Sequence, residues 1–459
     1  MQRPTERFSD KADVTALLGA FCFFLSAIEY MLPKPLPFMR LGIANLPILL
    51  AVDILPFRWF LVLAAVKVIG MSLISGTLFS YIALFSLFGT LAAALAMWTV
   101  RRAGGRFVSQ IGVSVAGAMV SNAIQVLIAR FLVFRETAWL IAPLFLTMGL
   151  ITGSALGLFA EHFARVSRWY AKALGHSAPD EGAMVEPLAG GADGSYALPS
   201  RGPLARLSAV RASIKENREN KAFSDSGKKA KTAAARVARR AKAEALFSPG
   251  ALALAGLLIM LAFLSMKGIL PKTLMLCLFV VAAWAMGKRF SLLVTLSVSL
   301  GIVIANLIVP SGRLLTTIFG LRITEGALLE GIGKALTFEG LMLLSKASIM
   351  SGLKLPGRIG RIVAAAFTYY DRIIEYKGKI HPASLAMDAD ALMIWVWESS
   401  ETHGASAATE SAALAGSTAS IGAPPEASGD PATRRKGLAI LIGVSFLAWA
   451  LALYLVGKR

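Results

Sequence analysis

The sequence predicts an all-α polytopic membrane protein, and two observations support this fold class. Of the 459 residues, 56% are hydrophobic and only 16% are charged, whereas soluble globular domains carry about 25% charged residues. Apolar runs long enough to cross a hydrocarbon core of roughly 30 Å as helices recur along most of the chain. The composition excludes an ordinary cytosolic enzyme, a disordered scaffold and a disulfide-stapled secreted domain.

Eleven apolar segments are predicted to span the membrane. Six lie in the first part of the chain, at about 14–33, 41–56, 58–75, 77–98, 110–133 and 139–160. Four more lie near 250–266, 271–286, 290–309 and 327–345, and the last one at 438–456. The first run contains Glu29 and lacks an A-x-A cleavage signal, so it is expected to be a retained span and not a signal peptide.

The polar stretches between these spans predict five parts of the chain. They are a six-span membrane domain at 1–162, a basic cytoplasmic linker at 163–248, a second membrane domain with a cytoplasmic helix at 249–398, a low-complexity linker at 399–436 and a C-terminal transmembrane helix at 437–459. The linker holds a basic, Ala-rich helix from Lys228 to Glu244, and a second basic helix is expected from Leu355 to Lys379.

The charges of the loops predict the orientation. Between Arg201 and Lys242 there are thirteen Lys and Arg residues and three acids, a net charge of +10 out of the chain's +20. Such a segment is hard to translocate and is attracted to anionic lipid at the cytoplasmic leaflet. Six preceding spans then place the N-terminus in the cytoplasm too. The sequence thus predicts a multi-pass protein of the inner (cytoplasmic) membrane, with membrane lipid as a partner and no nucleic acid.

Few ionisable residues lie within the predicted spans, and these are candidates for function because burying them is costly. Glu29 and Lys67 lie deep in their spans; they form either part of a ligand site or a structural ion pair. Asp53 and Arg130 lie near span ends, where a charged group reaches water easily. In the fifth span Ser114, Gly117, Ser121, Asn122 and Gln125 share one helix face, which serves either as helix–helix contact or as the wall of a cavity.

Small residues mark expected packing faces. Gly149, Gly153 and Gly157 form a doubled G-x-x-x-G in the sixth span, and Ala16 and Ala20 form a small-x-x-x-small pair in the first. This spacing lets helix backbones approach closely.

Three motifs carry a resemblance to a known family. They are Ile28-Glu29-Tyr-Met-Leu-Pro33, Met39-Arg40-Leu-Gly42-Ile-Ala-Asn45 and Gly112-Val-Ser-Val-Ala-Gly117 followed by Asn122 and Gln125. Over about 14–160 the chain resembles the heptaprenyl diphosphate synthase component I proteins, also called the Gx transporter family. These are similar to the substrate-binding S components of energy-coupling factor (ECF) transporters, which implies a bundle of six helices with both ends cytoplasmic.

The resemblance also implies roles for particular residues. In S components small residues of the first helix contact the transmembrane T component, and Ala16 and Ala20 match that spacing. The loop from Pro33 to Arg40 lies where S components carry a cap over the ligand cavity. Arg40 and Asn45 then join Glu29, Lys67, Asn122 and Gln125 as substrate-binding candidates, and Arg40 would suit an anionic ligand. The alternative for Arg40 is anchoring at lipid headgroups.

Residues 250–380 are more weakly similar to a T component, so a four-helix T-component-like module is expected there. T components grip their ATPases with Ala-Arg-Gly-like motifs, and this segment has none. A P-loop is also absent, because Leu328 stands where the motif before Lys334 needs glycine. Any energy for transport would have to come from separate ECF-type ATPase subunits.

The family's label suggests prenyl transfer, which needs Asp-rich motifs that hold Mg²⁺. Asp388 and Asp390 are the only aspartates spaced that closely, so no catalytic residues are expected. The four histidines and two cysteines lack metal-ligand spacing, and no metal or cofactor is expected either. The expected function is a non-enzymatic transporter component that binds a small vitamin-like or isoprenoid-related substrate. The alternatives are an accessory component of polyprenyl diphosphate or quinone side-chain synthesis, and a membrane scaffold without a ligand.

Overall fold

The computed structural model describes residues 11–31, 42–175, 234–288, 291–318, 321–350, 353, 355–376, 386–398 and 431–457. Within them, five stretches are long and apolar enough to cross a membrane: Lys11–Glu29, Phe57–Ser75, Tyr81–Gly104, Gln110–Val166 and Ala432–Tyr454. The fourth stretch contains two helices, α5 and α6, so the described part of the chain is that of a multi-pass membrane protein. Most of the linker predicted at 163–248 and most of that at 399–436 lie outside the described residues.

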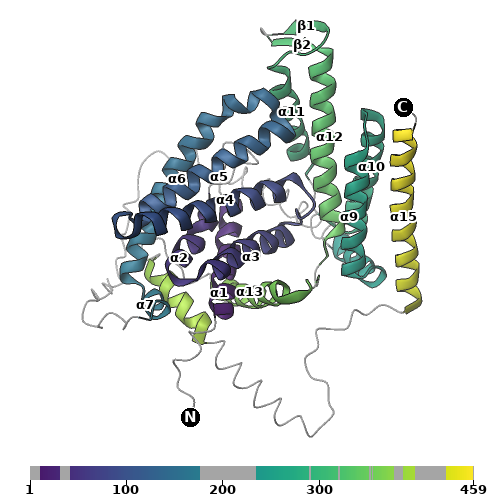
Figure 1. Cartoon of the computed structure of the whole chain (residues 1–459). Helices are drawn as coiled ribbons and strands as arrows, with labels where there is room; N and C mark the ends of the chain where they lie inside the picture. Colours follow the sequence, from purple (N-terminus) through teal and green to yellow (C-terminus); the bar gives the residue numbers. More distant parts are fainter. Residues whose placement is uncertain are drawn as a thin grey trace, which may run out of the picture.

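Six helices form the first bundle (Figure 1). They are α1 (Lys11–Met31), α2 (Leu46–Ile54), α3 (Phe57–Ser75), α4 (Tyr81–Gly104), α5 (Gln110–Ala129) and α6 (Ala138–Val166). A single-turn 3₁₀ helix, η2 (Ile43–Asn45), precedes α2. The span predicted at 41–56 is shorter than expected, because α2 has only 9 residues and covers less than half of a 30 Å core.

Glycines set how closely these helices approach. A Cβ atom placed at Gly157 would lie 2.4 Å from the Cα of Ile111, and one at Gly153 would lie 3.1 Å from the Cα of Val115. The doubled G-x-x-x-G face of α6 therefore packs directly on the backbone of α5. Between α1 and α3, a Cβ at Gly70 would lie 2.0 Å from the Phe23 ring, so this aromatic ring fills the space that the glycine leaves.

The second part contains α9 (Pro249–Ser265), α10 (Ile269–Ala285), α11 (Leu292–Leu307), α12 (Glu325–Ser348) and the C-terminal α15 (Pro431–Gly457). The basic helix Ala234–Leu246 joins α9 at a bend of 92°. Helices α9, α10 and α11 have 16 or 17 residues, at the lower limit for a span. In Figure 1 α4, α5 and α6 of the first bundle lie beside α12 and run at an angle to it, while α9, α10 and α15 lie roughly along it.

A β-hairpin lies at one end of α12, and the sequence did not predict it. Strand β1 (Leu314–Ile318) pairs antiparallel with β2 (Leu321–Thr324). The span predicted at 327–345 corresponds to α12, which begins at Glu325 directly after β2. The sequence of β1 is Leu-Leu-Thr-Thr-Ile. Its last three residues are β-branched, and β-branched residues favour an extended chain.

Two segments after α12 return to the first bundle. The amphipathic α13 (Gly357–Tyr376) and the helical residues 386–398 join the apolar core that α1 and α3 form. The Phe23 ring of α1 lies 5.2 Å from the ring of Phe367 and 6.1 Å from that of Tyr370. A stretch that the sequence assigned to the second membrane domain thus packs against the first.

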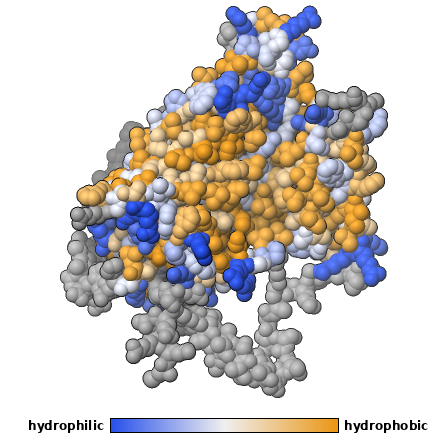
Figure 2. Space-filling view, viewed as in Figure 1, coloured by the Kyte–Doolittle hydropathy of each residue, from blue (hydrophilic) through white to orange (hydrophobic). Residues whose placement is uncertain are grey.

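The surface carries a broad apolar band between polar ends (Figure 2). Hydrophilic side chains gather over the hairpin at one end and in separate patches near the opposite end. Large apolar side chains such as Leu140, Leu158, Leu296 and Phe446 are more than half exposed. Exposed apolar side chains in this number on long helices are typical of lipid-facing surfaces.

Candidate functional site

A cavity of about 460 Å³ lies inside the first bundle and reaches α12. It falls in the size range of small-molecule sites. Its charged and amide-bearing lining residues are Glu29, Asn45, Lys67, Asn122, Gln125 and Lys346. Hydroxyl groups come from Ser26, Ser75, Thr77, Ser86, Thr90, Ser114, Ser121 and Thr152.

One wall of the cavity is built by α1, η2 and α3. The Lys67 ammonium of α3 donates a hydrogen bond to Oδ1 of Asn45, and a carboxylate oxygen of Glu29 accepts from the backbone N–H of Ala44 at 3.4 Å. The sharp turn before η2 depends on Gly42, whose φ of 86° is readily adopted only by glycine. Glu29 and Lys67 are both buried. Because each bonds to a residue of η2, the two opposite charges lie in the same wall of the cavity.

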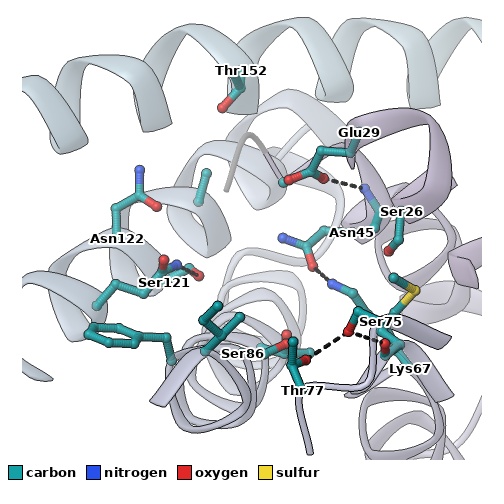
Figure 3. A pocket seen from close by; sticks show the side chains of 18 of the residues that line it. Ser26, Glu29, Asn45, Lys67, Ser75, Thr77, Ser86, Ser121, Asn122 and Thr152 are labelled. Atoms are coloured by element: carbon teal, nitrogen blue, oxygen red, sulfur yellow. Dashed lines mark hydrogen bonds between the residues drawn. The ribbon is translucent and has the colours of Figure 1, made fainter. Parts of the chain in front are cut away.

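The opposite wall is the polar face of α5. Figure 3 shows Ser121 and Asn122 across the cavity from Asn45 and Lys67. The Asn122 amide donates to the carbonyl oxygen of Phe145 in α6 at 2.6 Å, and the Gln125 amide donates to Oγ of Ser121 at 3.1 Å. These bonds fix the amides at the cavity and satisfy donors that would be costly to bury unpaired.

Glycines make room for these amides. A Cβ at Gly149 of α6 would lie 2.5 Å from Nδ2 of Asn122, and one at Gly89 of α4 would lie 3.1 Å from Nε2 of Gln125. The small residues beside the polar face therefore serve the cavity as well as the helix packing.

Five of the six substrate-binding candidates come together at this cavity: Glu29, Asn45, Lys67, Asn122 and Gln125. Arg40, the sixth, lies outside the described residues, as does the loop expected to cap the cavity. Sequence reasoning missed Lys346 and Met342 of α12. Nothing in the hydropathy of α12 indicates that it borders the first bundle, so only the tertiary structure places them here.

Asp53 and Arg130, expected near span ends, are both paired. Asp53 holds Arg101 through two hydrogen bonds of 2.8 and 3.0 Å, and also accepts from Gln110 at 2.7 Å and from the Tyr170 hydroxyl at 3.4 Å. Burial, followed by the nearby Asp53 carboxylate, raises the pKa of Tyr170 above its usual value. Arg130 bonds Glu136 at 2.7 Å. Neither group lines the cavity.

The packing candidates lie in helix contacts. Gly149, Gly153 and Gly157 of α6 face α5, as described above. Ala16 and Ala20 are buried in the core that α1 shares with α3 and α13. A Cβ at Gly19, between them, would lie 2.9 Å from Cγ1 of Val66 in α3 and 3.4 Å from Cβ of Ala366 in α13. The small-residue stretch of α1 thus contacts a helix from the second half of the chain.

The described residues hold no group of three His, Cys, Asp or Glu side chains that could bind a metal ion. Asp390 has a structural role in the described fold. Its carboxylate accepts from the Ser167 hydroxyl and from the backbone N–H groups of Arg168 at 3.1 Å and Trp169 at 2.9 Å. It therefore caps the N-terminus of α7 (Arg168–Ala173) from another helix.

Comparisons with known proteins identify two segments. Residues 18–163, from α1 to α6, match the model of the heptaprenyl diphosphate synthase component I family, which confirms the resemblance inferred for 14–160. Residues 249–351, from α9 to just past α12, match a domain of unknown function (DUF8519). That match does not support the T-component likeness expected for 250–380. No curated protein and no solved structure matches the chain.

Proposed function

We propose that this protein is the membrane-embedded, substrate-binding component of an uptake transporter of the ECF type. The observation that carries the proposal is the cavity between α1, α3, α4, α5 and α6, which is lined by the buried polar side chains of Glu29, Lys67, Asn122 and Gln125. Polar groups inside a membrane are costly, and they are retained mainly where they serve a pathway or a ligand. A small molecule is the ligand that a cavity of about 460 Å³ accommodates.

The contact between α1 and α13 supports a fused arrangement. Small residues of α1 pack on α13, in the place where the family resemblance expects a separate scaffold subunit. In this proposal the second half of the chain serves as the scaffold, and separate ATPase subunits supply the energy. The N-terminus and the basic helix Ala234–Leu246 lie on the cytoplasmic side, as the charge of the neighbouring sequence favours.

Ligand retention tests the proposal. Purified wild-type protein should carry a small molecule that mass spectrometry detects after denaturation, and Asn122→Ala should retain at least ten-fold less, because the Asn122 amide is lost from the cavity wall. Asn306→Ala is the matched control: it removes a buried amide bonded to the carbonyl of Val133, away from the cavity. An equal loss of the retained molecule in both variants would contradict the proposal. So would wild-type protein that retains no molecule, if cells lacking the protein also take up small molecules as well as normal cells do.

A second candidate is an accessory role in polyprenyl diphosphate or quinone side-chain synthesis, which the description of the matched family favours. In that case deletion should shorten the quinone side chain, and the protein should co-purify with a soluble prenyl synthase. Co-purification with a pair of ATPases and a normal side chain would instead favour transport.

A further inference from the structure

The cavity is completed by a helix from outside the first bundle. Met342 and Lys346 of α12 line it together with residues of α1, α3, α4, α5 and α6. They belong to the segment that matches a domain of unknown function, not to the segment that matches the heptaprenyl diphosphate synthase component I family. The site is therefore shared between the two parts of the chain.

Several contacts hold α12 against the cavity. The Ser345 hydroxyl accepts a hydrogen bond from the backbone N–H of Phe79 at 3.0 Å. In the turn after α3, Gly76 has a φ of 64°, and a Cβ there would lie 3.7 Å from both the Cα and the Cγ of Lys346. The Tyr81 and Phe338 rings lie 6.2 Å apart. The stem of Lys346 is thus packed against the α3–α4 turn, at the edge of the cavity.

The described lining residues of the cavity carry more positive than negative charges. Among its described lining residues, two lysines, Lys67 and Lys346, accompany one acid, Glu29. Lys67 shares its wall with Glu29 and is bonded to Asn45. The nearest acid in the sequence of α12, Glu339, lies two turns before Lys346; it is buried and does not line the cavity. An ammonium group that lines a partly buried cavity favours a negatively charged ligand.

The region near Lys346 also offers apolar surface. The cavity is also lined by Ile74 of α3, Ile82 and Phe85 of α4, and Met342, one turn before Lys346 on α12. Methionine and aromatic side chains suit a flexible apolar body. A ligand that satisfies both features carries an anionic group at one end and a hydrocarbon part at the other.

We propose that the ligand is a small amphiphilic anion, bearing a carboxylate or a phosphate, and that Lys346 of α12 binds its anionic group. This inference rests on the proposed function, because it assigns the ligand class of the same cavity. It makes the second half of the chain part of the binding site as well as a scaffold.

Binding of simple amphiphiles to the full-length protein tests this. The probes are hexyl phosphate, hexanoate and the neutral hexan-1-ol, and the readout is the concentration dependence of the melting temperature. We expect one of the two anions to bind at least ten-fold more tightly than hexan-1-ol. Tighter binding of hexyl phosphate would identify a phosphate ligand, and tighter binding of hexanoate a carboxylate ligand.

Lysine variants identify the residue responsible. Lys346→Gln should weaken binding of the anion at least ten-fold and leave hexan-1-ol unaffected, and Lys346→Arg should restore it. Lys272→Gln is the matched control, because this half-buried lysine of α10 bonds Thr337 at 2.8 Å and does not line the cavity. Melting of each variant without a probe checks that it folds.

The outcomes separate the two proposals. Equal binding of hexan-1-ol and the anions, or anion binding that Lys346→Gln leaves unchanged, overturns the role of Lys346. If Asn122→Ala nevertheless weakens probe binding, the cavity still binds ligands and the proposed function stands. Wild-type protein that none of the probes stabilises and that retains no molecule on purification contradicts both.

Discussion

At the residue scale, the partly buried Asp53 bonds to partners far away in the sequence. Asp53 of α2 bonds Arg101 of α4, Gln110 of α5 and Tyr170 of α7. A partly buried carboxylate that neutralises an arginine contributes more than an exposed ion pair, because solvent screens it less. This group of side chains therefore joins four helices at one end of the bundle.

Asp53→Ala should lower the free energy of unfolding by about 2 kcal/mol, because Arg101 loses both of its charged hydrogen bonds. Glu161→Ala, which removes an exposed i,i+4 partner of Arg165, should cost less than about 0.5 kcal/mol. Thermal or denaturant unfolding in detergent measures both values. Similar costs for the two variants would show that the Asp53 group contributes nothing beyond a surface pair.

Tyr170 predicts a loss of stability at alkaline pH. Because burial and Asp53 hold its pKa above the usual value of about 10, the unfolded chain loses this proton first as the pH rises. The native state then binds more protons than the unfolded state, so stability is complete below about pH 10 and falls above it. This one group lowers the free energy of unfolding by at most about 1.4 kcal/mol per pH unit.

Comparison with Tyr170→Phe isolates this effect. Between pH 8 and pH 11 the melting temperature of the variant should fall less than that of the wild type, since phenylalanine has no proton to release. The hydrogen bond to Asp53 is absent from the variant at both pH values, so its loss cancels in the difference. An equal alkaline loss in both proteins would exclude Tyr170 as its source.

At the element scale, the contact of α5 with α6 depends on glycines that face backbone atoms. Gly157→Ala should destabilise the protein by about 1–3 kcal/mol, because the new Cβ would lie 2.4 Å from the Cα of Ile111 and a backbone atom cannot rotate away. Gly301→Ala in α11 is the matched control, since no atom lies within 4 Å of its added Cβ. It should be neutral or stabilising by up to about 1 kcal/mol.

Unfolding measurements on the two glycine variants check this. A destabilised Gly301→Ala protein would mean that alanine itself, and not the close helix approach, is responsible. A fully stable Gly157→Ala protein would show that α5 and α6 separate without cost.

At the scale of the whole molecule, the hairpin β1–β2 and the basic helix Ala234–Leu246 lie toward opposite ends of the second group of helices (Figure 1). The basic helix follows the most strongly positive segment of the chain, which favours the cytoplasmic side. The hairpin is then expected on the outer side of the membrane.

Labelling of single cysteines in intact cells tests this orientation. In a Cys277→Ser background, whose remaining Cys22 is buried, a membrane-impermeant maleimide should label Arg313→Cys, at the position directly before β1 of the hairpin. It should label Lys242→Cys in the basic helix only after the membrane is permeabilised. The reverse pattern would place the N-terminus and the linker outside.

The sequence by itself determined the membrane class, the positions of the apolar helices and four candidate residues that line the cavity, Glu29, Lys67, Asn122 and Gln125, whereas Asn45 followed only from the family resemblance. These follow from properties of single segments: a long apolar run forms a helix whatever it contacts, and the period of 3.6 residues places Ser114, Ser121, Asn122 and Gln125 on one face of α5. The length of α2 was overestimated, because the apolar run around it continues past the helix.

Only the tertiary structure decided that Lys346 borders the cavity, that α13 packs on α1 and that Asp390 caps α7. Each depends on contacts between distant residues, such as the bond from the backbone of Phe79 to Ser345, 266 positions later. A lysine on α12 has the same local sequence signal whether it faces lipid, a neighbouring helix or a ligand. Which of these it meets depends on how close-packed helices fit together, and that is a property of the whole fold.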